Sequence, residues 1–209
     1  RAAYASAASA VTVSLALATA QNTGAAGSDT LTNIEELEGS AFNDSLTGSA
    51  NADLLLGLAG NDTLAGSAGN DTLEGGAGDD SIDGGTGADR ASYANAASAV
   101  TVNLATVTAQ NTLGAGTDTL TNFDDLEGSA FNDTLTGDGN ANLLLGLAGN
   151  DTLTGGVGND TLEGGAGNDS ISGGTETDRV TYANASGAVF VSLATAIAHL
   201  RDGVERLEK

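Results

Sequence analysis

The feature that most constrains this chain is a nine-residue unit that begins with glycine. Residues 57–83 hold three consecutive copies, which read G-L-A-G-N-D-T-L-A, G-S-A-G-N-D-T-L-E and G-G-A-G-D-D-S-I-D. Each copy has glycine at the first and fourth places, aspartate at the sixth, and leucine or isoleucine at the eighth. Because glycine tolerates positive φ, two glycines within four residues let the backbone turn sharply. The unit therefore predicts a six-residue loop followed by a three-residue strand.

The strand part of the unit predicts an all-β solenoid with a thin core. In a three-residue strand the eighth place points inward and its two neighbours point outward, so Leu64, Leu73 and Ile82 should line the interior. Two units complete one coil of eighteen residues with a loop at each edge. Each loop then stacks on the loop two units later, at the strand spacing of about 4.8 Å. The predicted fold is a parallel β-roll or β-helix.

The stacked loops predict calcium sites. Two turns of backbone carbonyls and two aspartates wall each gap between loops, and Ca²⁺ takes six to eight oxygen ligands at about 2.3–2.6 Å. Mg²⁺ fits less well because it keeps its waters and demands a tighter octahedron. Glycine, asparagine and aspartate are also ordinary turn residues, which would explain one such loop. Turn chemistry alone does not explain aspartate at the same place in unit after unit.

The candidate ligands come from two blocks of six units, at residues 39–92 and 128–181, and from two isolated units. The sixth-place candidates are Asp44, Asp53, Asp62, Asp71, Asp80, Asp89, Asp133, Asn142, Asp151, Asp160, Asp169 and Asp178, with Asp29 and Asp118 from the isolated units. The fourth-place candidates are Gly60, Gly69, Gly78, Gly87, Gly149, Gly158 and Gly167. Three loops per edge leave two gaps, which predicts up to about four Ca²⁺ ions per block. The pairs expected to bind best are Asp62/Asp80, Asp71/Asp89, Asp151/Asp169 and Asp160/Asp178.

Four positions depart from the pattern. Phe42 and Phe131 replace the fourth-place glycine of each opening unit, so these loops are expected to act as lids rather than tight calcium sites. Asn142 is neutral and should weaken its site. Glu176 replaces a fourth-place glycine near the end of the second block, which puts that site in doubt.

A larger repeat of 89 residues contains the smaller one. Arg1, Arg90 and Arg179 are equally spaced, and so are Tyr4, Tyr93 and Tyr182, which we expect to pack over coil ends. The predicted segments are 1–3, the end of a preceding unit; 4–92, the first module, with spacer 4–38 and units 39–92; 93–181, the second module, with spacer 93–127 and units 128–181; and 182–209, a partial third module or C-terminal cap. A chain that starts in mid-repeat is expected to be a piece of a longer protein.

The spacers are predicted to continue the solenoid as wider coils. Val11, Val13 and Leu15 alternate with polar residues, which is a β-strand pattern. Each spacer contains one isolated unit, at 24–32 or 113–121. These units have no partner two units away, so they are expected to bind weakly or to serve as plain turns.

The six-residue links and the tail complete the chain. The links at 33–38 and 122–127 are expected to turn their apolar residues inward and keep their acids outside; these apolar residues are Ile34, Leu37, Phe123 and Leu126. In the tail, Ile197, Leu200, Val204 and Leu207 have near-helical spacing, which favours a short helical cap over the open end. A shortened spacer is the alternative, because G-V-E-R-L-E matches N-I-E-E-L-E and Gly203 disfavours a helix.

Composition excludes several classes of function. The chain of 209 residues has 28 acidic and 6 basic side chains, a net charge of −22, so no basic patch exists for nucleic acid. No stretch approaches the roughly 18 apolar residues of a membrane span, and the absence of cysteine excludes disulfides. No H-E-x-x-H or G-x-S-x-G motif occurs. An array of equivalent sites is a binding or structural device, so we predict no enzymatic activity.

With these units the chain resembles the RTX (repeats-in-toxin) family, and the match covers most of its length. The resemblance implies export through a type I channel to the outside or surface of a Gram-negative bacterium, with folding on contact with extracellular calcium. We expect the calcium-free chain to be largely disordered, because the carboxylate ladders repel each other and a glycine-rich chain loses much entropy on ordering.

Two hypotheses for the parent protein differ in class. The first is a structural repeat segment of an adhesin, surface layer or filament, which the 89-residue duplication favours; its partners would be neighbouring modules of the same or another chain. The alternative is an accessory domain that aids export and folding of a secreted enzyme or toxin. Carbohydrate binding on the flat faces is a third hypothesis, which the 3% content of aromatic residues disfavours.

Overall fold

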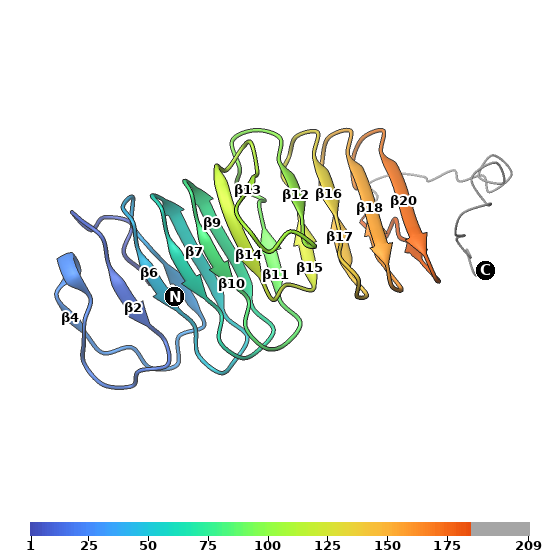
Figure 1. The fold of residues 1–209 in the computed structure, drawn as a ribbon. Coiled ribbons are helices and arrows are strands. Elements are labelled where there is room, and N and C mark those ends of the chain that lie inside the picture. Colours follow the sequence, from blue (N-terminus) through green and yellow to red (C-terminus); the bar gives the residue numbers. More distant parts are fainter. Residues whose placement is uncertain (185–209) are drawn as a thin grey trace, which may run out of the picture.

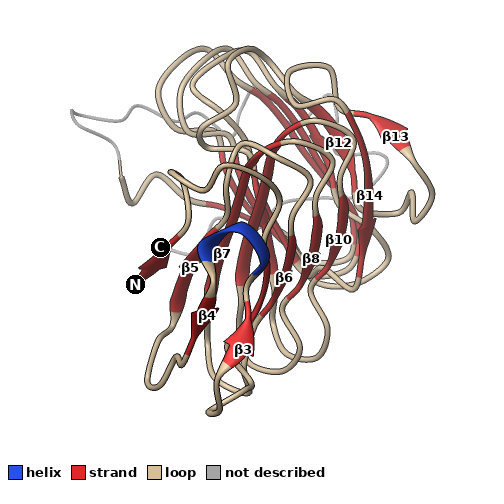
Figure 2. Cartoon of the chain, turned by 90° about the vertical axis from the view of Figure 1, so that its left-hand side faces the viewer, coloured by secondary structure: helices blue, strands red, loops and turns tan. Residues whose placement is uncertain are grey.

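The computed structural model describes residues 1–184 and shows an elongated solenoid of stacked coils (Figure 1). Each coil contributes one strand to each of two opposite faces, and loops turn the chain at both edges (Figure 2). The fold is nearly all strand, as predicted, with parallel pairing between successive coils. The predicted C-terminal cap lies outside the described residues. Within residues 1–184 no helix has the length and apolar character needed to cross a bilayer.

One face is a single sheet that runs through both modules, here called the long sheet. Its nine strands, in spatial order, are β1 (Ala2–Ala3), β5 (Glu36–Glu38), β7 (Leu54–Ala59), β9 (Thr72–Ala77), β11 (Arg90–Ser92), β15 (Asp125–Glu127), β17 (Leu143–Leu145), β19 (Thr161–Glu163) and β21 (Arg179–Val180). All pairs in this sheet are parallel.

The opposite face is divided between two shorter sheets. The first consists of β2 (Thr12–Ser14), β6 (Ser45–Thr47), β8 (Thr63–Ala65), β10 (Ser81–Asp83), β14 (Thr117–Thr121) and β13 (Gln110–Asn111). The second consists of β12 (Thr101–Asn103), β16 (Thr134–Thr136), β18 (Thr152–Val157) and β20 (Ser170–Thr175). A two-stranded sheet, β3 (Gln21–Asn22) and β4 (Ser28–Asp29), and the 3-10 turn η1 (Gly24–Ala26) lie in the first spacer.

The core is a double row of apolar side chains in register, which come from the eighth places of the units and from the links. On the long sheet Leu37 pairs with Leu55, and Leu55 with Leu73, all three fully buried. On the opposite face Leu46, Leu64 and Ile82 pair in the same way. Parallel in-register pairing at an eighteen-residue period places like side chains on one another, so the alternation of the sequence produces the interior directly.

The spacers depart from the predicted wider coil. In the second spacer β12 skips forward and pairs with β16 of the following coil, and the chain then returns through β13, which is antiparallel to β14. β14 in turn pairs with β10 of the preceding coil. An isolated antiparallel bridge pairs Val100, just before β12, with Leu113, just after β13. The alternating valines do face inward, since Val100 and Val102 are each 1% exposed.

Candidate calcium sites

The loops stack in rows along the two edges of the solenoid, as the repeat predicts. Loops of the first edge lead from the long sheet to the short sheets, and loops of the second edge lead back. In the first-edge row the backbone N–H of Asp44 donates to Asp62 Oδ1 (2.7 Å), and that of Asp62 to Asp80 Oδ1 (2.8 Å). The same bond joins Asp53 to Asp71 in the second-edge row (2.8 Å). Each sixth-place carboxylate therefore ties its own coil to the preceding one.

The second oxygen of many of these carboxylates is buried without a partner. Within the described part of the chain, the buried carboxylate oxygens that no donor reaches are Asp53 Oδ1 and the Oδ2 atoms of Asp62, Asp71, Asp80, Asp89, Asp151 and Asp160. A buried, unpaired carboxylate oxygen is costly unless a proton or a cation satisfies it. These seven residues are all among the predicted ligands.

The two glycines of each loop create the space in front of these oxygens. A Cβ on the first-place Gly57 would collide with Asp62 Oδ2 and with the carbonyl oxygen of Gly75 in the next coil. The fourth-place Gly78 has φ 142°, and a Cβ there would collide with the carbonyl oxygen of Gly60. A carboxylate oxygen of one coil and a carbonyl oxygen of the next coil thus lie together in front of the first-place glycine.

This donor set fits a hard cation. Among residues 1–184 no group of three or more acidic, histidine or cysteine side chains converges on one point, so most ligands of an ion here would be backbone carbonyls. Carboxylate and carbonyl oxygens together are ligands that Ca²⁺ accepts in flexible numbers. Bound calcium would supply positive charge to the unpaired oxygens and cross-link successive coils.

The raised pKa values of the aspartates in the rows also favour a bound cation. Burial raises the pKa of Asp62 to about 7, against the opposing effect of the Asp44 N–H, and the carboxylates of Asp80 and Asp44 raise it further. Burial likewise raises the pKa values of Asp71, Asp80 and Asp151 to about 6. Without a cation, these carboxyl groups therefore stay protonated at pH values well above those at which aspartate ordinarily loses its proton.

In the opening loop of each block, hydrogen bonds from the protein already satisfy the sixth-place carboxylate. Asp44 Oδ1 accepts bonds from the Val11 N–H (2.7 Å) and the Ser40 hydroxyl (2.8 Å), and Oδ2 accepts the Ser40 N–H (2.5 Å). Asp133 is held in the same way by Val100 and Ser129. The phenyl rings of Phe42 and Phe131 in these loops are each 43% exposed. Asp44 and Asp133 therefore act as caps on their rows.

The expectation that the isolated units have no stacking partner is wrong for Asp118. Because the spacer folds out of the way, β14 stacks on β10, and the N–H of Asp80 donates to Asp118 Oδ1 (3.1 Å). The hydroxyls of Tyr93 and Thr112 donate to Asp118 Oδ2 (both 3.0 Å). The row that begins at Asp44 thus extends by one coil and ends at a carboxylate satisfied by neutral donors.

The first module repeats this arrangement at its own start. Tyr4 and Thr23 donate to Asp29 Oδ2 at 3.0 and 3.2 Å. Tyr4 and Tyr93 are both buried, as expected of residues that pack over coil ends, whereas Tyr182 at the end of the described residues is 42% exposed.

The remaining candidates lie in the rows of the second block. The N–H of Asp133 donates to Asp151 and that of Asp151 to Asp169 on the first edge. On the second edge the N–H of Asp160 donates to Asp178 Oδ1 (3.1 Å). Glu176 adopts φ 81° and so keeps the left-handed turn of the glycine that it replaces.

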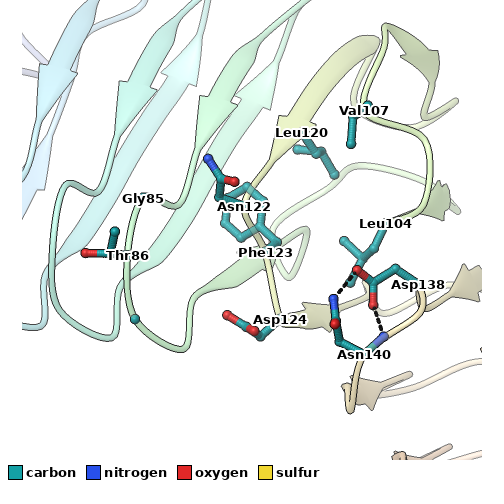
Figure 3. Close-up of a pocket in the computed structure, with 11 residues that line it drawn as sticks. Gly85, Thr86, Leu104, Val107, Leu120, Asn122, Phe123, Asp124, Asp138 and Asn140 are labelled. Atoms are coloured by element: carbon teal, nitrogen blue, oxygen red, sulfur yellow. Dashed lines mark hydrogen bonds between the residues drawn. The ribbon is translucent and has the colours of Figure 1, made fainter. Parts of the chain in front are cut away.

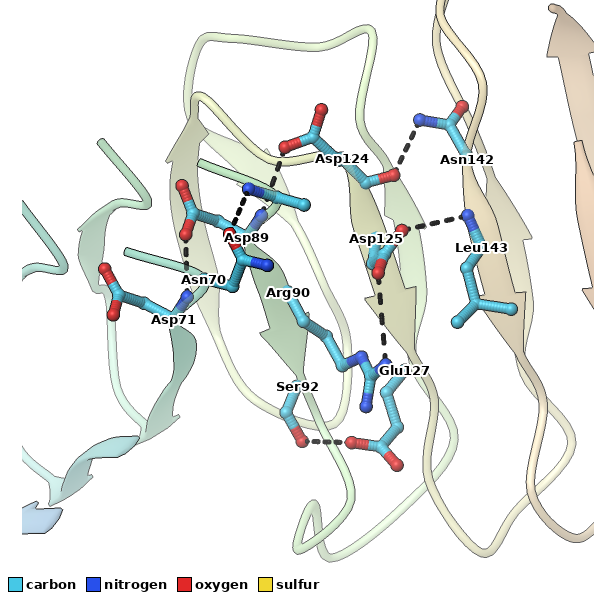
Figure 4. Close-up of polar contacts among 11 residues, drawn as sticks. Asn70, Asp71, Asp89, Arg90, Ser92, Asp124, Asp125, Glu127, Asn142 and Leu143 are labelled. Carbon is cyan, nitrogen blue, oxygen red and sulfur yellow. Dashed lines mark hydrogen bonds and ion pairs between the residues drawn. The ribbon is translucent and has the colours of Figure 1, made fainter. Parts of the chain in front are cut away.

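Asn142 shows why one loop of the second edge carries an amide (Figure 4). Its Nδ2 donates to the backbone carbonyl of Asp124 (2.7 Å) and to Asp138 Oδ1 (3.2 Å). Its Oδ1 accepts the Asp138 N–H (2.8 Å). The preceding coil offers a carbonyl to Nδ2, where other coils offer an N–H, so a carboxylate oxygen in the place of Nδ2 would lack a donor. The amide provides a hydrogen bond in place of charge.

Two features of the loops were not predicted from the sequence. Fifth-place asparagines form a second ladder, in which Asn61 Oδ1 accepts from Asp79 N–H (3.1 Å) and Asn43 Oδ1 from Asn61 N–H (2.9 Å). The recurrent Asn-Asp dipeptide was the available signal. The link residue Asp124 also enters the second-edge row, since its Oδ2 accepts the Asp89 N–H (3.1 Å); the links had been expected to keep their acids outside.

Comparison with known families agrees with this geometry. The model of the RTX calcium-binding nonapeptide repeat matches in four copies, at residues 23–64, 56–91, 121–153 and 145–180. These matches cover more than half of the chain. The chain belongs to the RTX calcium-binding repeat family. No curated protein matches it. RTX repeats bind calcium, and the loops described above are the RTX loops of this chain.

The raised pKa values predict that acid stabilises the calcium-free fold. In an unfolded chain aspartate titrates near 3.9, so between about pH 4 and 7 the folded form binds more protons than the unfolded form, and stability falls as pH rises through this window. Metal-stripped protein should therefore show more β signal by circular dichroism at pH 5 than at pH 7.5. An unchanged spectrum between these two pH values would contradict the burial of the carboxylates.

Replacing the Asn142 amide should hinder folding. In Asn142→Asp a carboxylate would face the Asp124 carbonyl and the Asp138 carboxylate, a loss of about 1–3 kcal/mol for an unsatisfied buried group. We expect the calcium concentration at the folding midpoint to rise. The exposed Asn159→Asp adds the same charge but keeps the acceptor for Thr177 N–H, and should shift the midpoint little. A midpoint for Asn142→Asp at or below that of the wild type would mean that position 142 ligates calcium instead.

Proposed function

We propose that this chain is a calcium-folded structural repeat segment of a secreted or cell-surface bacterial protein, of the adhesin, surface-layer or filament type. The observation that carries the proposal is the set of buried carboxylate oxygens that no donor reaches within residues 1–184, arranged in rows along both edges. A cation at each gap would convert repulsion between coils into cross-links, so folding and binding would be one event.

The structural role is supported by the long sheet. It continues from β9 and β11 of the first module into β15 and β17 of the second without a change of direction. Repeat arrays of this kind gain length by adding modules, each of which contacts only its neighbours. RTX repeats are typical of bacterial proteins exported by type I secretion, and outside the cell calcium would be available to trigger folding.

The positions of the proposed ions follow from the rows of loops. We propose ions between Asp62 and Asp80 and between Asp71 and Asp89 in the first block, since the unpaired Oδ2 atoms of Asp62 and Asp71 lie close to the carbonyl oxygens of Gly75 and Gly84 in the next coil. In the second block Asp151 and Asp160 supply unpaired oxygens toward Asp169 and Asp178. Asp44, Asp133 and Asn142 are left out because their side chains are already satisfied.

A calcium titration of the metal-stripped protein, followed by far-ultraviolet circular dichroism at pH 7.5, tests the proposal. We expect a coil spectrum that becomes β with Ca²⁺ and not with Mg²⁺. Asp71→Asn keeps an acceptor for the Asp53 N–H but loses the unpaired oxygen, and should raise the midpoint roughly tenfold, because affinity follows the charge of the ligand set.

The matched control is Asp79→Asn. It removes the same charge from an exposed fifth-place residue that accepts Thr117 N–H through Oδ1, and should leave the midpoint within about twofold, since exposed charges interact weakly. Equal shifts for the two variants would make the effect one of net charge, and a β spectrum already complete in chelator would refute calcium-coupled folding.

A further inference from the structure

At the boundary between the modules the second edge has lost half of a loop. Between β10 and β11 the edge loop has six residues, 84–89, whereas between β14 and β15 only residues 122–124 make the same turn. Asn122 makes this possible by adopting φ 57°, a left-handed conformation that asparagine tolerates. Residues 122–124 are here called the link loop.

The link loop reproduces two features of a full RTX loop. A Cβ on Gly84 would collide with the carbonyl oxygen of Asn122, as a Cβ on Gly57 would with that of Gly75. Asp124 Oδ2 accepts the N–H of Asp89 (3.1 Å), as Asp89 Oδ1 accepts the N–H of Asp71 (2.8 Å). The Asn122 carbonyl therefore takes the place of the first-place glycine carbonyl of a regular loop. The Asp124 carboxylate takes the place of the sixth-place aspartate.

The loop on the other side of this gap presents an unsatisfied oxygen. Asp89 is 0% exposed, and its Oδ2 has no hydrogen-bond partner within the described residues. This oxygen lies in front of Gly84, the same glycine over which the Asn122 carbonyl sits. We infer that Asp89, Asp124 and the Asn122 carbonyl form a calcium site that joins the two modules, an inference that rests on the proposed calcium-coupled folding.

The missing half-loop should make this site the weakest of the second edge. A hollow of about 420 Å³ replaces the loop, bordered by Gly85, Thr86 and Gly87 on one side and by Asp138 and Asn140 on the other (Figure 3). Asp124 lines the hollow, so water would complete the coordination where a full loop would supply carbonyls. Fewer protein ligands give lower affinity for Ca²⁺.

The hollow belongs to the module rather than to this boundary alone. A similar hollow of about 250 Å³ in the first module is lined by Leu15, Leu31 and Asn33, which correspond at the 89-residue spacing to Leu104, Leu120 and Asn122 of the larger one. Glu35 stands where the second module has Asp124. Each link thus carries an acid at the same place.

An ion at this site would decide how firmly the modules are joined. At the boundary Asp89 lies next to Asp124, and Asp125 pairs with Arg90 at 3.9 Å (Figure 4). The Coulombic effect of Asp124 on Asp89 is repulsive. Calcium bound between Asp89 and Asp124 would replace this repulsion with attraction of both carboxylates to one cation, beside the β11–β15 pair of the long sheet.

The test is the number of calcium ions bound, measured by isothermal titration calorimetry on the full chain. Asp124→Asn keeps an acceptor for the Asp89 N–H but loses the carboxylate; it should bind one ion fewer and lack the weakest phase, with an unchanged β spectrum at saturating calcium. Asp124→Glu keeps a carboxylate, as at Glu35, and should bind the full number. Asp125→Asn is the charge-matched control, because it retains an acceptor for Leu143 N–H, and should also bind the full number.

Equal counts and isotherms for wild type and Asp124→Asn would overturn the junction site. Loss of an ion in both Asp124→Asn and Asp124→Glu would assign the effect to backbone disturbance and overturn it as well. A wild-type chain that binds no calcium would refute the proposed function itself, which distinguishes the two failures.

Discussion

Every coil of this solenoid depends on the sixth-place carboxylate, which faces two demands at once. One oxygen accepts the N–H of the aspartate in the preceding coil and thereby fixes the stacking register. The other is buried against the first-place glycine and the carbonyl of the next coil. The bond gives the rod its period, and the unpaired oxygen creates an electrostatic cost that recurs in seven of the described loops. Glycine is required because a side chain would occupy the space between them.

The places where the chain avoids this cost are as informative as the places where it does not. Ser40 saturates Asp44, Tyr93 and Thr112 saturate Asp118, and the amide of Asn142 avoids a carboxylate altogether. These residues lie at the start of a block, at the end of a row and beside the module boundary. Neutral donors therefore replace the need for a cation at these three places, whereas unpaired carboxylate oxygens remain in other stacked loops.

Much of the fold could be predicted from the unit alone. Glycine and aspartate at fixed places specify the loop, and the eighth-place leucine specifies the core, because both follow from local conformation and an in-register period. The path of the spacer could not be predicted in this way. Its valines indicate strands, but whether β12 pairs backward or forward depends on the long-range fit of β14 onto β10. For the same reason Asp118 was wrongly expected to have no stacking partner.

The candidate sites show the same division. The unpaired oxygens belong to predicted residues, because their positions follow from the repeat. Asp124 was missed because it lies in a link whose sequence does not match the unit and becomes equivalent to a loop aspartate only after folding. The donor role of Asn142 depends on a carbonyl contributed by that same link. Site residues whose positions follow from the local repeat could be predicted from the sequence. Site residues whose positions depend on a change of strand register could not.

The most direct test of this account is to locate the cations themselves. Anomalous diffraction from crystals of the calcium-loaded protein should show peaks in two rows, each between stacked loops and within about 2.3–2.6 Å of carboxylate and carbonyl oxygens. The account predicts occupied gaps beside the unpaired oxygens of Asp62, Asp71 and Asp151 and no ion at Asp44. An ordered solenoid with water or protonated carboxylates in those gaps, and no anomalous peaks, would contradict it.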